Sequence, residues 1–424
     1  MTQELATKPE VLQVDNCRAC DNKNLTTFLQ LGPTPIPNGF LEASELNQAE
    51  KFYPLDVSFC GECGMVQLGH VVDPNVMFKN YVYVPSTSTT MVQHFGELAT
   101  DATQRVNLET GDLVVDIGSN DGTLLKAFKR YGATILGVDP ATNLATLANE
   151  QGVPTINELF DKNLALSIRS QHGPARVISA TNVVAHVHNL HDFFEGVHDL
   201  LADNGKLVME FPYLVNLIEG GEFDTIYQEH LSYLSINPLQ KLLAQHGLNL
   251  TSPRLIDIHG GSIRVFATKS KPESDDGVTA FITTEREKGM LDLETYSRFQ
   301  MDVNRVRHDL VEALWSLRFA DRKVVGYGAS AKGNILTNYC RIGVESLPYI
   351  VDSIPYKQGK YTPGMHIPIY PEDQLLEDQP DYALLLAWNF ADEIVQKQGT
   401  FQKRGGKFIR PIPVLKVIHP SRKV

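Results

Sequence analysis

The stretch from Val114 to Leu125 constrains the fold most, because it reads as a strand, a tight loop and the start of a helix. An apolar run at 114–117 enters a loop that contains Gly118 and Gly122, and apolar residues at helical spacing follow. Such a loop lets backbone N–H groups approach a nucleotide-like ligand closely. The sequence therefore predicts a ligand site at the carboxyl end of this strand.

Segments with strand and helix patterns alternate after this loop. Alternation of this kind predicts a doubly wound α/β sheet of parallel strands, with the ligand at their carboxyl ends. We expect a preceding helix around Phe95 and Leu98, strands at 114–117, 134–138, 176–180, 206–210 and 262–268, and helices at 123–131, 144–151, 190–201 and 237–246.

A second α/β pattern follows a polar linker at 269–277 and a long amphipathic helix at 296–317. Strands are expected at 323–326, 349–351, 382–387 and 408–410, which predicts a C-terminal Rossmann-like domain. In the loop at 326–334, the first six residues read G-x-G-x-x-A, and Lys332 directly follows them. A helix N-terminus with one lysine suits a substrate diphosphate. Two alternatives stay open: an NAD site that uses Asp352, or a plain strand–helix connection.

Four of the five cysteines form two C-x-x-C pairs, Cys17 with Cys20 and Cys60 with Cys63. Four thiolates match the tetrahedral preference of zinc and leave no open coordination position, so we expect a structural Zn²⁺. The residues between the pairs exceed those of a compact zinc ribbon, which predicts an inserted loop that includes residues 31–38. A redox role fits less well, because neither pair heads a thioredoxin-like unit.

Length and charge restrict the classes of partner. A chain of 424 residues predicts two or three domains, and 42% hydrophobic residues supply their cores. The net charge of −12 argues against a nucleic-acid partner. Neither a leader pattern nor a membrane-length apolar run is visible, so we expect a soluble, cytoplasmic protein.

The segment 227–233 offers the richest set of groups for acid–base chemistry. Glu229 and His230 are adjacent, so one side chain could reach a substrate while the other orients it. Histidine has a pKa near neutrality, which suits a general base, although a lone histidine is more often structural. Tyr81 and Tyr83 alternate on an extended segment, where they could line a sugar pocket or serve interface packing.

The glycine loop itself resembles a known motif. Its D-x-G-x-x-x-G spacing is similar to motif I of class I S-adenosylmethionine-dependent methyltransferases, and Asp139 follows the next strand, where a carboxylate can accept hydrogen bonds from ribose hydroxyls. Asn182 follows a third strand at the same edge. The resemblance implies that S-adenosylmethionine is bound by Asp116, Gly118, Asn120, Gly122, Asp139 and Asn182.

Over nearly its whole length the chain resembles the three-domain, zinc-containing sugar C-methyltransferases. The cysteine pairs, the cofactor loop, the Glu229–His230 pair and the C-terminal glycine loop occur in the order of that family. The resemblance implies a zinc-binding module at 1–78, a methyltransferase domain at 79–290 and a Rossmann-like substrate domain at 291–424. It implies methyl transfer from S-adenosylmethionine, through an enolate, to C-3 of a nucleotide-linked 4-keto-deoxyhexose. A dTDP-linked sugar is the first expectation.

By similarity, His230 is the base, and Glu229 and Tyr227 orient it or contact the sugar. Tyr81, Tyr83 and His186 would line the same pocket, and Asn182, Lys332 and Asn334 would contact the substrate. An O- or N-methyltransferase and a non-catalytic cofactor-binding scaffold are the alternatives. We expect a monomer, because three modules already offer one another surfaces to bury.

Overall fold

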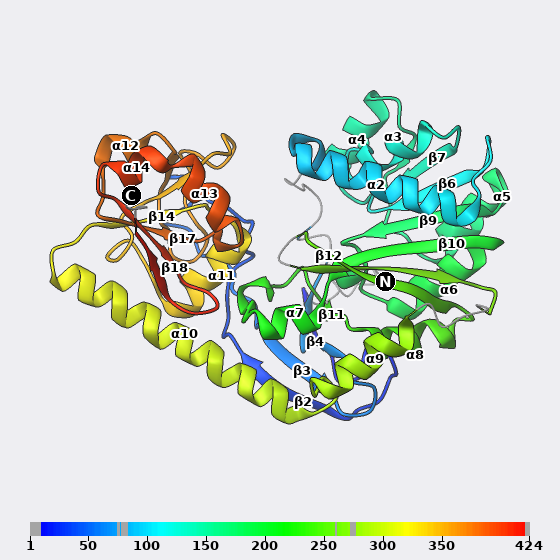
Figure 1. Ribbon diagram of the computed structural model, residues 1–424, viewed down its shortest axis with the longest axis horizontal. Helices are drawn as coiled ribbons and strands as arrows, with labels where there is room; N and C mark the ends of the chain where they lie inside the picture. Colours follow the sequence, from blue (N-terminus) through cyan, green and yellow to red (C-terminus); the bar gives the residue numbers. More distant parts are fainter. Residues whose placement is uncertain (1–9, 74–76, 78–83, 259–260, 272–276, 420–424) are drawn as a thin grey trace, which may run out of the picture. The chain divides into compact units, whose positions relative to one another are not determined.

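The computed structural model describes residues 10–73, 77, 84–258, 261–271 and 277–419, and the chain forms two compact units (Figure 1). Unit 1 comprises Met1–Thr26, Ser58–Val215 and Leu231–Asp292, and unit 2 comprises Thr27–Val57, Asn216–His230 and Leu293–Val424. Each unit therefore joins segments that are distant in sequence. None of the helices in the described ranges is long and apolar enough to cross a membrane.

A seven-stranded sheet in the order β12-β13-β10-β9-β6-β7-β8 forms the centre of unit 1. Of the strands in this sheet, β6 comes first in the sequence. It lies between β7 and β9 and pairs with both in parallel, so the strand order reverses there. Open α/β sheets bind ligands at the carboxyl ends beside such a reversal. The strands are β6 (Leu113–Ile117), β7 (Thr134–Val138), β8 (Thr155–Ile156), β9 (Ala175–Thr181), β10 (Leu201–Pro212), β12 (Asn249–Ile256) and β13 (Ser262–Thr268).

The sheet confirms the doubly wound prediction, but the expectation that all its strands are parallel was wrong. Strand β13 runs antiparallel to both β10 and β12. The connection at 257–261 between β12 and β13 is too short for a crossover, which needs a dozen or more residues. Strand β12 was not predicted at all; its burial does not alternate along the strand, and its register with β13 shifts between Thr251 and Arg254.

Helices cover both faces of this sheet, with α2, α3 and α4 on one face and α6 on the other (Figure 1). The expected helix before β6 is α2, which begins after Ser88, whose side chain accepts a hydrogen bond from the N–H of Met91. The helices of unit 1 are α2 (Thr89–Val106), α3 (Thr123–Lys129), α4 (Thr142–Glu150), α5 (Lys162–His172), α6 (Leu190–Leu200), α8 (Ile236–Gln245) and α9 (Val278–Glu287). Of these, α5 and α9 were not predicted.

Short strands flank the cysteines: Cys60 ends β3, and Cys17, Cys20 and Cys63 lie in loops or turns beside the strands. One sheet has the order β11-β4-β3-β2, and β1 pairs with β5. Because β11 pairs with β4, the chain directly after His230 is fixed to the cysteine module. These strands are β1 (Val11–Gln13), β2 (Leu25–Gln30), β3 (Asp56–Cys60), β4 (Val66–Leu68), β5 (His70–Val72) and β11 (Ser232–Tyr233).

Unit 2 contains a six-stranded sheet in the order β16-β15-β14-β17-β18-β19, and only β19 is antiparallel to its neighbour. The first strand again lies in the middle, which confirms the Rossmann-like prediction. The strands are β14 (Val324–Tyr327), β15 (Ile350–Asp352), β16 (Ile369–Pro371), β17 (Tyr382–Leu385), β18 (Lys407–Arg410) and β19 (Lys416–Ile418).

The predicted long helix is α10 (Leu293–Phe319), which buries Tyr296, Phe299 and Val303 at helical spacing. Sequence periodicity missed the shorter helices near the C-terminus, which have too few turns to show it. The remaining helices are α7 (Leu214–Glu219), α11 (Ala331–Cys340), α12 (Gln374–Asp378), α13 (Ala391–Lys397) and α14 (Gly399–Lys403).

Candidate active site

The loop after β6 needs glycine at two positions. Gly118 and Gly122 have φ of +68° and +76°, a region that side chains rarely adopt. A Cβ on Gly118 would lie 2.4 Å from Cγ2 of Val183, and one on Gly122 would lie 2.7 Å from Cγ1 of Val153. The loop is therefore held tightly against its neighbours at the carboxyl edge of the sheet.

Asp139, which follows β7, holds the loop. Its Oδ2 accepts the N–H of Asn120 at 2.8 Å, and its Oδ1 accepts the N–H of Ala141 at 2.8 Å. Burial raises the pKa of the Asp139 carboxyl, although these two bonds stabilise its charged form. The structure thus brings Asn120 and Asp139 together, and each carboxylate oxygen keeps a second lone pair for ribose hydroxyls.

Asp116 and Asn182 lie in different environments. Asp116 is 2% exposed, and its Oδ1 accepts the hydroxyl of Ser179 at 2.6 Å. Burial raises the pKa of Asp116 to about 7, and the charge of Asp139 acts in the same direction. Asn182 has φ of +56° and donates its N–H to the carbonyl oxygen of Glu210 at 2.7 Å. Contact of either side chain with a cofactor stays a prediction.

These features fit S-adenosylmethionine. A strand, a glycine loop and a helix stand at the reversal of strand order, and the Asp139 carboxylate follows the neighbouring strand. The backbone N–H groups of the loop and a carboxylate near a ribose are the groups that an adenosyl ligand requires.

The four predicted metal ligands form one cluster. Their Sγ atoms all lie within 4.8 Å of one another, with Cys17 to Cys63 at 3.5 Å and Cys20 to Cys60 at 3.7 Å. Tetrahedral zinc with Zn–S bonds of about 2.3 Å separates its sulfurs by about 3.8 Å. The hydrogen bond between Cys17 and Cys63 lowers the pKa of the Cys17 thiol to about 5 and raises the pKa of Cys63, so Cys17 is the thiolate of this pair. The donor set therefore fits a structural zinc ion.

His230 lies in a turn whose geometry fixes its ring. The N–H of His230 donates to the carbonyl oxygen of Tyr227 at 2.9 Å, and the two rings are 4.1 Å apart. Nδ1 lies 2.7 Å from the carbonyl oxygen of Thr225. A carbonyl oxygen only accepts, so Nδ1 carries the proton of the neutral ring and Nε2 has the lone pair.

Glu229 has a different hydrogen-bond partner from its neighbour His230. The carboxyl group is 2% exposed, and its Oε1 accepts the Nδ2–H of Asn38 at 2.9 Å. Burial raises the pKa of Glu229 to about 7, and the bond from Asn38 opposes that rise. Sequence reasoning missed Asn38, because nothing local connects it with a residue that far along the chain.

His186 ends a short 3-10 helix, Val184–His186, and is half-buried. The N–H of Leu231 donates to the carbonyl oxygen of Ala185 at 2.8 Å. Tyr81 and Tyr83 fall outside the described residues, and their roles stay predictions.

The second glycine loop carries its own polar contacts in unit 2. Lys332 Nζ lies 3.1 Å from Oε2 of Glu222 and 5.3 Å from the ring centroid of Trp388. Asn334 is 1% exposed and donates Nδ2–H to the carbonyl oxygen of Pro37 at 2.7 Å. Substrate contact by either residue stays a prediction.

The NAD alternative needs the Asp352 carboxylate for a ribose. Its Oδ2 accepts the N–H of Ala329 at 2.7 Å, and Lys357 Nζ lies 3.4 Å from the same oxygen. Asp139 makes similar backbone bonds, but Asp352 has in addition a cation that pairs with it. This arrangement favours a carboxylate that stabilises the loop.

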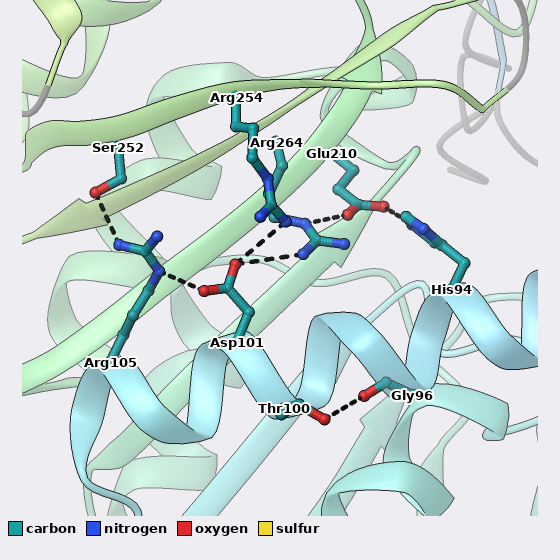
Figure 2. Close-up of polar contacts among 9 residues, drawn as sticks. All are labelled: His94, Gly96, Thr100, Asp101, Arg105, Glu210, Ser252, Arg254 and Arg264. Carbon is teal, nitrogen blue, oxygen red and sulfur yellow. Dashed lines mark hydrogen bonds and ion pairs between the residues drawn. The ribbon is translucent and has the colours of Figure 1, made fainter.

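A buried polar network in unit 1 was missed by the sequence analysis (Figure 2). Glu210 lies between His94 and Arg264, and Asp101 contacts the far end of Arg264. The residues come from α2, β10 and β13, so no local spacing connects them. A signal did exist: Glu210 directly follows the buried apolar run 207–209 of β10, and Arg264 is the one charged residue of β13.

Comparison with known proteins identifies the family. The C-methyltransferase NovU of Streptomyces niveus is 38% identical over 410 residues, which cover 96% of this chain and 98% of NovU. The chain belongs to this C-methyltransferase family. Three family models match it: a "Putative zinc binding domain" at 17–78, a methyltransferase domain at 92–252 and a C-methyltransferase C-terminal domain at 257–413. The protein is an S-adenosylmethionine-dependent C-methyltransferase with a four-cysteine zinc-binding domain.

Solved structures resemble part of the chain more distantly. Magnesium protoporphyrin IX methyltransferase (ChlM) from Synechocystis with bound SAM is 15% identical, with a TM-score of 0.33, over 42% of this chain and 79% of ChlM. An S-adenosylmethionine-dependent methyltransferase from Clostridium acetobutylicum is 10% identical, with a TM-score of 0.34, over 42% of this chain and 92% of that enzyme. Similarity at this level carries no weight for the substrate.

Proposed function

We propose that this C-methyltransferase methylates C-3 of a nucleotide-linked 4-keto-deoxyhexose, with a dTDP-sugar as the first candidate. One observation supports this most: Nδ1 of His230 lies 2.7 Å from the carbonyl oxygen of Thr225. The neutral ring therefore has its lone pair on Nε2, which is the form that a general base requires.

Methylation at carbon needs such a base, because a C–H carbon has no lone pair. In the proposed reaction His230 Nε2 takes the C-3 proton, the C–H electron pair forms the C-3–C-4 double bond, and the ketone oxygen gains the negative charge. S-adenosylmethionine, when bound, would supply an electrophilic methyl group: the enolate electron pair would form the bond from C-3 to that methyl group, the C-4 ketone would be restored, and the electron pair of the S–CH₃ bond would remain on sulfur. The proton on His230 then passes to solvent.

The remaining groups divide into donor and acceptor sites. We propose that the cofactor is bound by Asp116, Gly118, Asn120, Gly122, Asp139 and Asn182. The pocket for the sugar is lined by Tyr81, Tyr83, His186, Tyr227 and Glu229. Lys332 and Asn334 belong to the first turn of α11, where N–H groups and a cation favour a diphosphate. The division into modules at 1–78, 79–290 and 291–424, and the monomeric state, belong to the same proposal.

Solvent exchange is the experiment that tests the proposed chemistry. Nucleotide-linked 4-ketosugars are incubated with the enzyme in D₂O, and loss of the C-3 proton is followed by NMR. Exchange at C-3, followed by a methyl group at that carbon when the methyl donor is added, is the expected result. A methyl group on oxygen or nitrogen, or no exchange with any member of the panel, would overturn the proposal.

Replacing His230 tests its role. His230→Asn should lower kcat about 10²- to 10⁴-fold, which is the usual contribution of a general base, without changing S-adenosylmethionine affinity measured by calorimetry. His308→Asn is the control, because that side chain is 76% exposed on α10. Unchanged turnover in His230→Asn would remove His230 from the mechanism.

A further inference from the structure

Residues 34–38 of unit 2, here called the proline loop, accept or donate hydrogen bonds to three residues at or next to the proposed sugar site. Gln228 Nε2 donates to the hydroxyl of Thr34 at 2.8 Å and to its carbonyl oxygen at 3.2 Å. Asn334 donates to the carbonyl oxygen of Pro37, and Asn38 donates to Glu229. The bonds at Thr34 and Pro37 already attach the loop, so the Asn38 bond is not needed to dock it.

The Asn38–Glu229 bond decides which oxygen of the carboxyl group can carry a proton. The Asn38 Nδ2 group only donates, and it lies 2.9 Å from Oε1, so Oε1 is an acceptor in both protonation states. When the acid is protonated, the proton is therefore on Oε2. Since burial raises the pKa of Glu229 to about 7, the neutral acid is well populated near neutral pH.

A neutral carboxylic acid in a buried site can donate a hydrogen bond to an oxygen that becomes negative. Such donors stabilise an enolate more strongly than the ketone from which it forms, and therefore lower the barrier. The backbone of Glu229 is next to that of His230, and the proline loop limits where its carboxyl group can turn.

We propose that Asn38 is a positioning residue that holds Glu229 with Oε2–H directed to donate to the C-4 oxygen of the substrate as the enolate forms. No covalent bond changes at Glu229 in this step. The identity of the acceptor oxygen rests on the proposed function, whereas the control of Glu229 by Asn38 does not.

The first test needs no substrate. The full chain is labelled with ¹³C at its glutamate carboxyl groups, and Glu229→Gln assigns the Glu229 signal in an NMR titration. Asn38→Leu removes the donor at similar size, so the pKa of Glu229 should rise. Asn47→Leu, the same substitution at an exposed asparagine of unit 2, should leave it unchanged. An identical Glu229 titration in wild type and Asn38→Leu would overturn the proposal.

The second test measures coupling between the two residues. Asn38→Leu should lower kcat about 10- to 100-fold, the effect expected for loss of one hydrogen bond to an ionisable group, with the KM for S-adenosylmethionine unchanged. Because Asn38 acts through Glu229, the double variant Asn38→Leu/Glu229→Gln should be no slower than Glu229→Gln. Asn47→Leu should keep wild-type turnover. Multiplying effects in the double variant would contradict a positioning role.

The two tests separate this inference from the proposed function. If wild type methylated no 4-ketosugar, the proposed substrate would be wrong, and the carboxyl titration would still decide whether Asn38 controls Glu229. If the sugar were methylated while the titration and the double variant showed no coupling, the inference alone would fail.

Discussion

Glu210 and Arg264 lie directly opposite each other on strands β10 and β13, and Arg264 Nε donates to Glu210 Oε1 at 2.5 Å (Figure 2). They are 3% and 2% exposed. The second carboxylate oxygen lies 2.6 Å from Nε2 of His94, so the pair also fixes α2 to the sheet. Since the Glu210 carbonyl oxygen accepts the N–H of Asn182, this network supports the edge of the proposed cofactor site.

Breaking this pair should destabilise unit 1. Arg264→Met leaves the Glu210 carboxylate buried without its main partner, and we expect the free energy of unfolding to fall by about 3–5 kcal/mol. Urea denaturation followed by circular dichroism measures it. Arg254→Met is the control: it contacts Asp101 at 3.4 Å but is 55% exposed, so about 1 kcal/mol or less is expected. Equal losses of unfolding free energy in the two variants would show that burial of the Glu210–Arg264 pair does not determine its contribution to stability.

The cofactor loop should reject a side chain at Gly118. Gly118→Ala combines φ of +68° with a Cβ 2.4 Å from Val183, which is β-branched and cannot turn away easily. We expect loss of S-adenosylmethionine binding in calorimetry and a drop in thermal stability. Gly152→Ala is matched in φ, at +76°, but its Cβ meets nothing within 4 Å. It should cost only about 1–2 kcal/mol for the backbone conformation and leave binding intact. Normal binding by Gly118→Ala would contradict the close packing of this loop.

Asp116 should make stability depend on pH. Its pKa is raised to about 7 in the folded chain from an ordinary value of 3.8, so the folded state binds more protons than the unfolded state between those values. Stability from this group is therefore full below about pH 4 and is lost as the pH rises towards 7, by on the order of 4 kcal/mol.

Asp116→Asn removes this dependence, because an amide does not ionise. Its thermal midpoint relative to wild type should be higher at pH 8 than at pH 5. Asp203→Asn, at a side chain that is 99% exposed, should show no such difference. The same offset at both pH values in Asp116→Asn would refute the assignment.

The cysteine cluster should account for all bound zinc. Cys60→Ser removes one of four thiolates and should abolish stoichiometric zinc, measured by elemental analysis, and lower the thermal midpoint. Cys340 is the natural control, because it is the fifth cysteine and lies outside the cluster. Cys340→Ser should keep one zinc ion per chain; zinc retained by Cys60→Ser would assign the metal to other ligands.

Local patterns in the sequence were enough for much of the fold. The strands Thr134–Val138 and Ser262–Thr268 were predicted to the residue, because apolar runs between breakers report strands directly. The C-x-x-C spacing identified a metal cluster, since each short turn brings its two thiols together. The glycine loop, and the place of Asp139 beside it, were predictable because these segments are close in the chain, whereas the contact of Asp139 with a ribose stays a prediction.

Only the tertiary structure decided the relationships between distant segments. Asn38 and Glu229 are 191 residues apart, and the His94–Glu210–Arg264 network joins three elements, so no periodicity could report either. The direction of β13 depended on a short connection, and the His230 tautomer on a carbonyl five residues earlier in a turn. Sequence periodicity records which face of an element is buried, whereas hydrogen-bond partners are selected only when those faces meet.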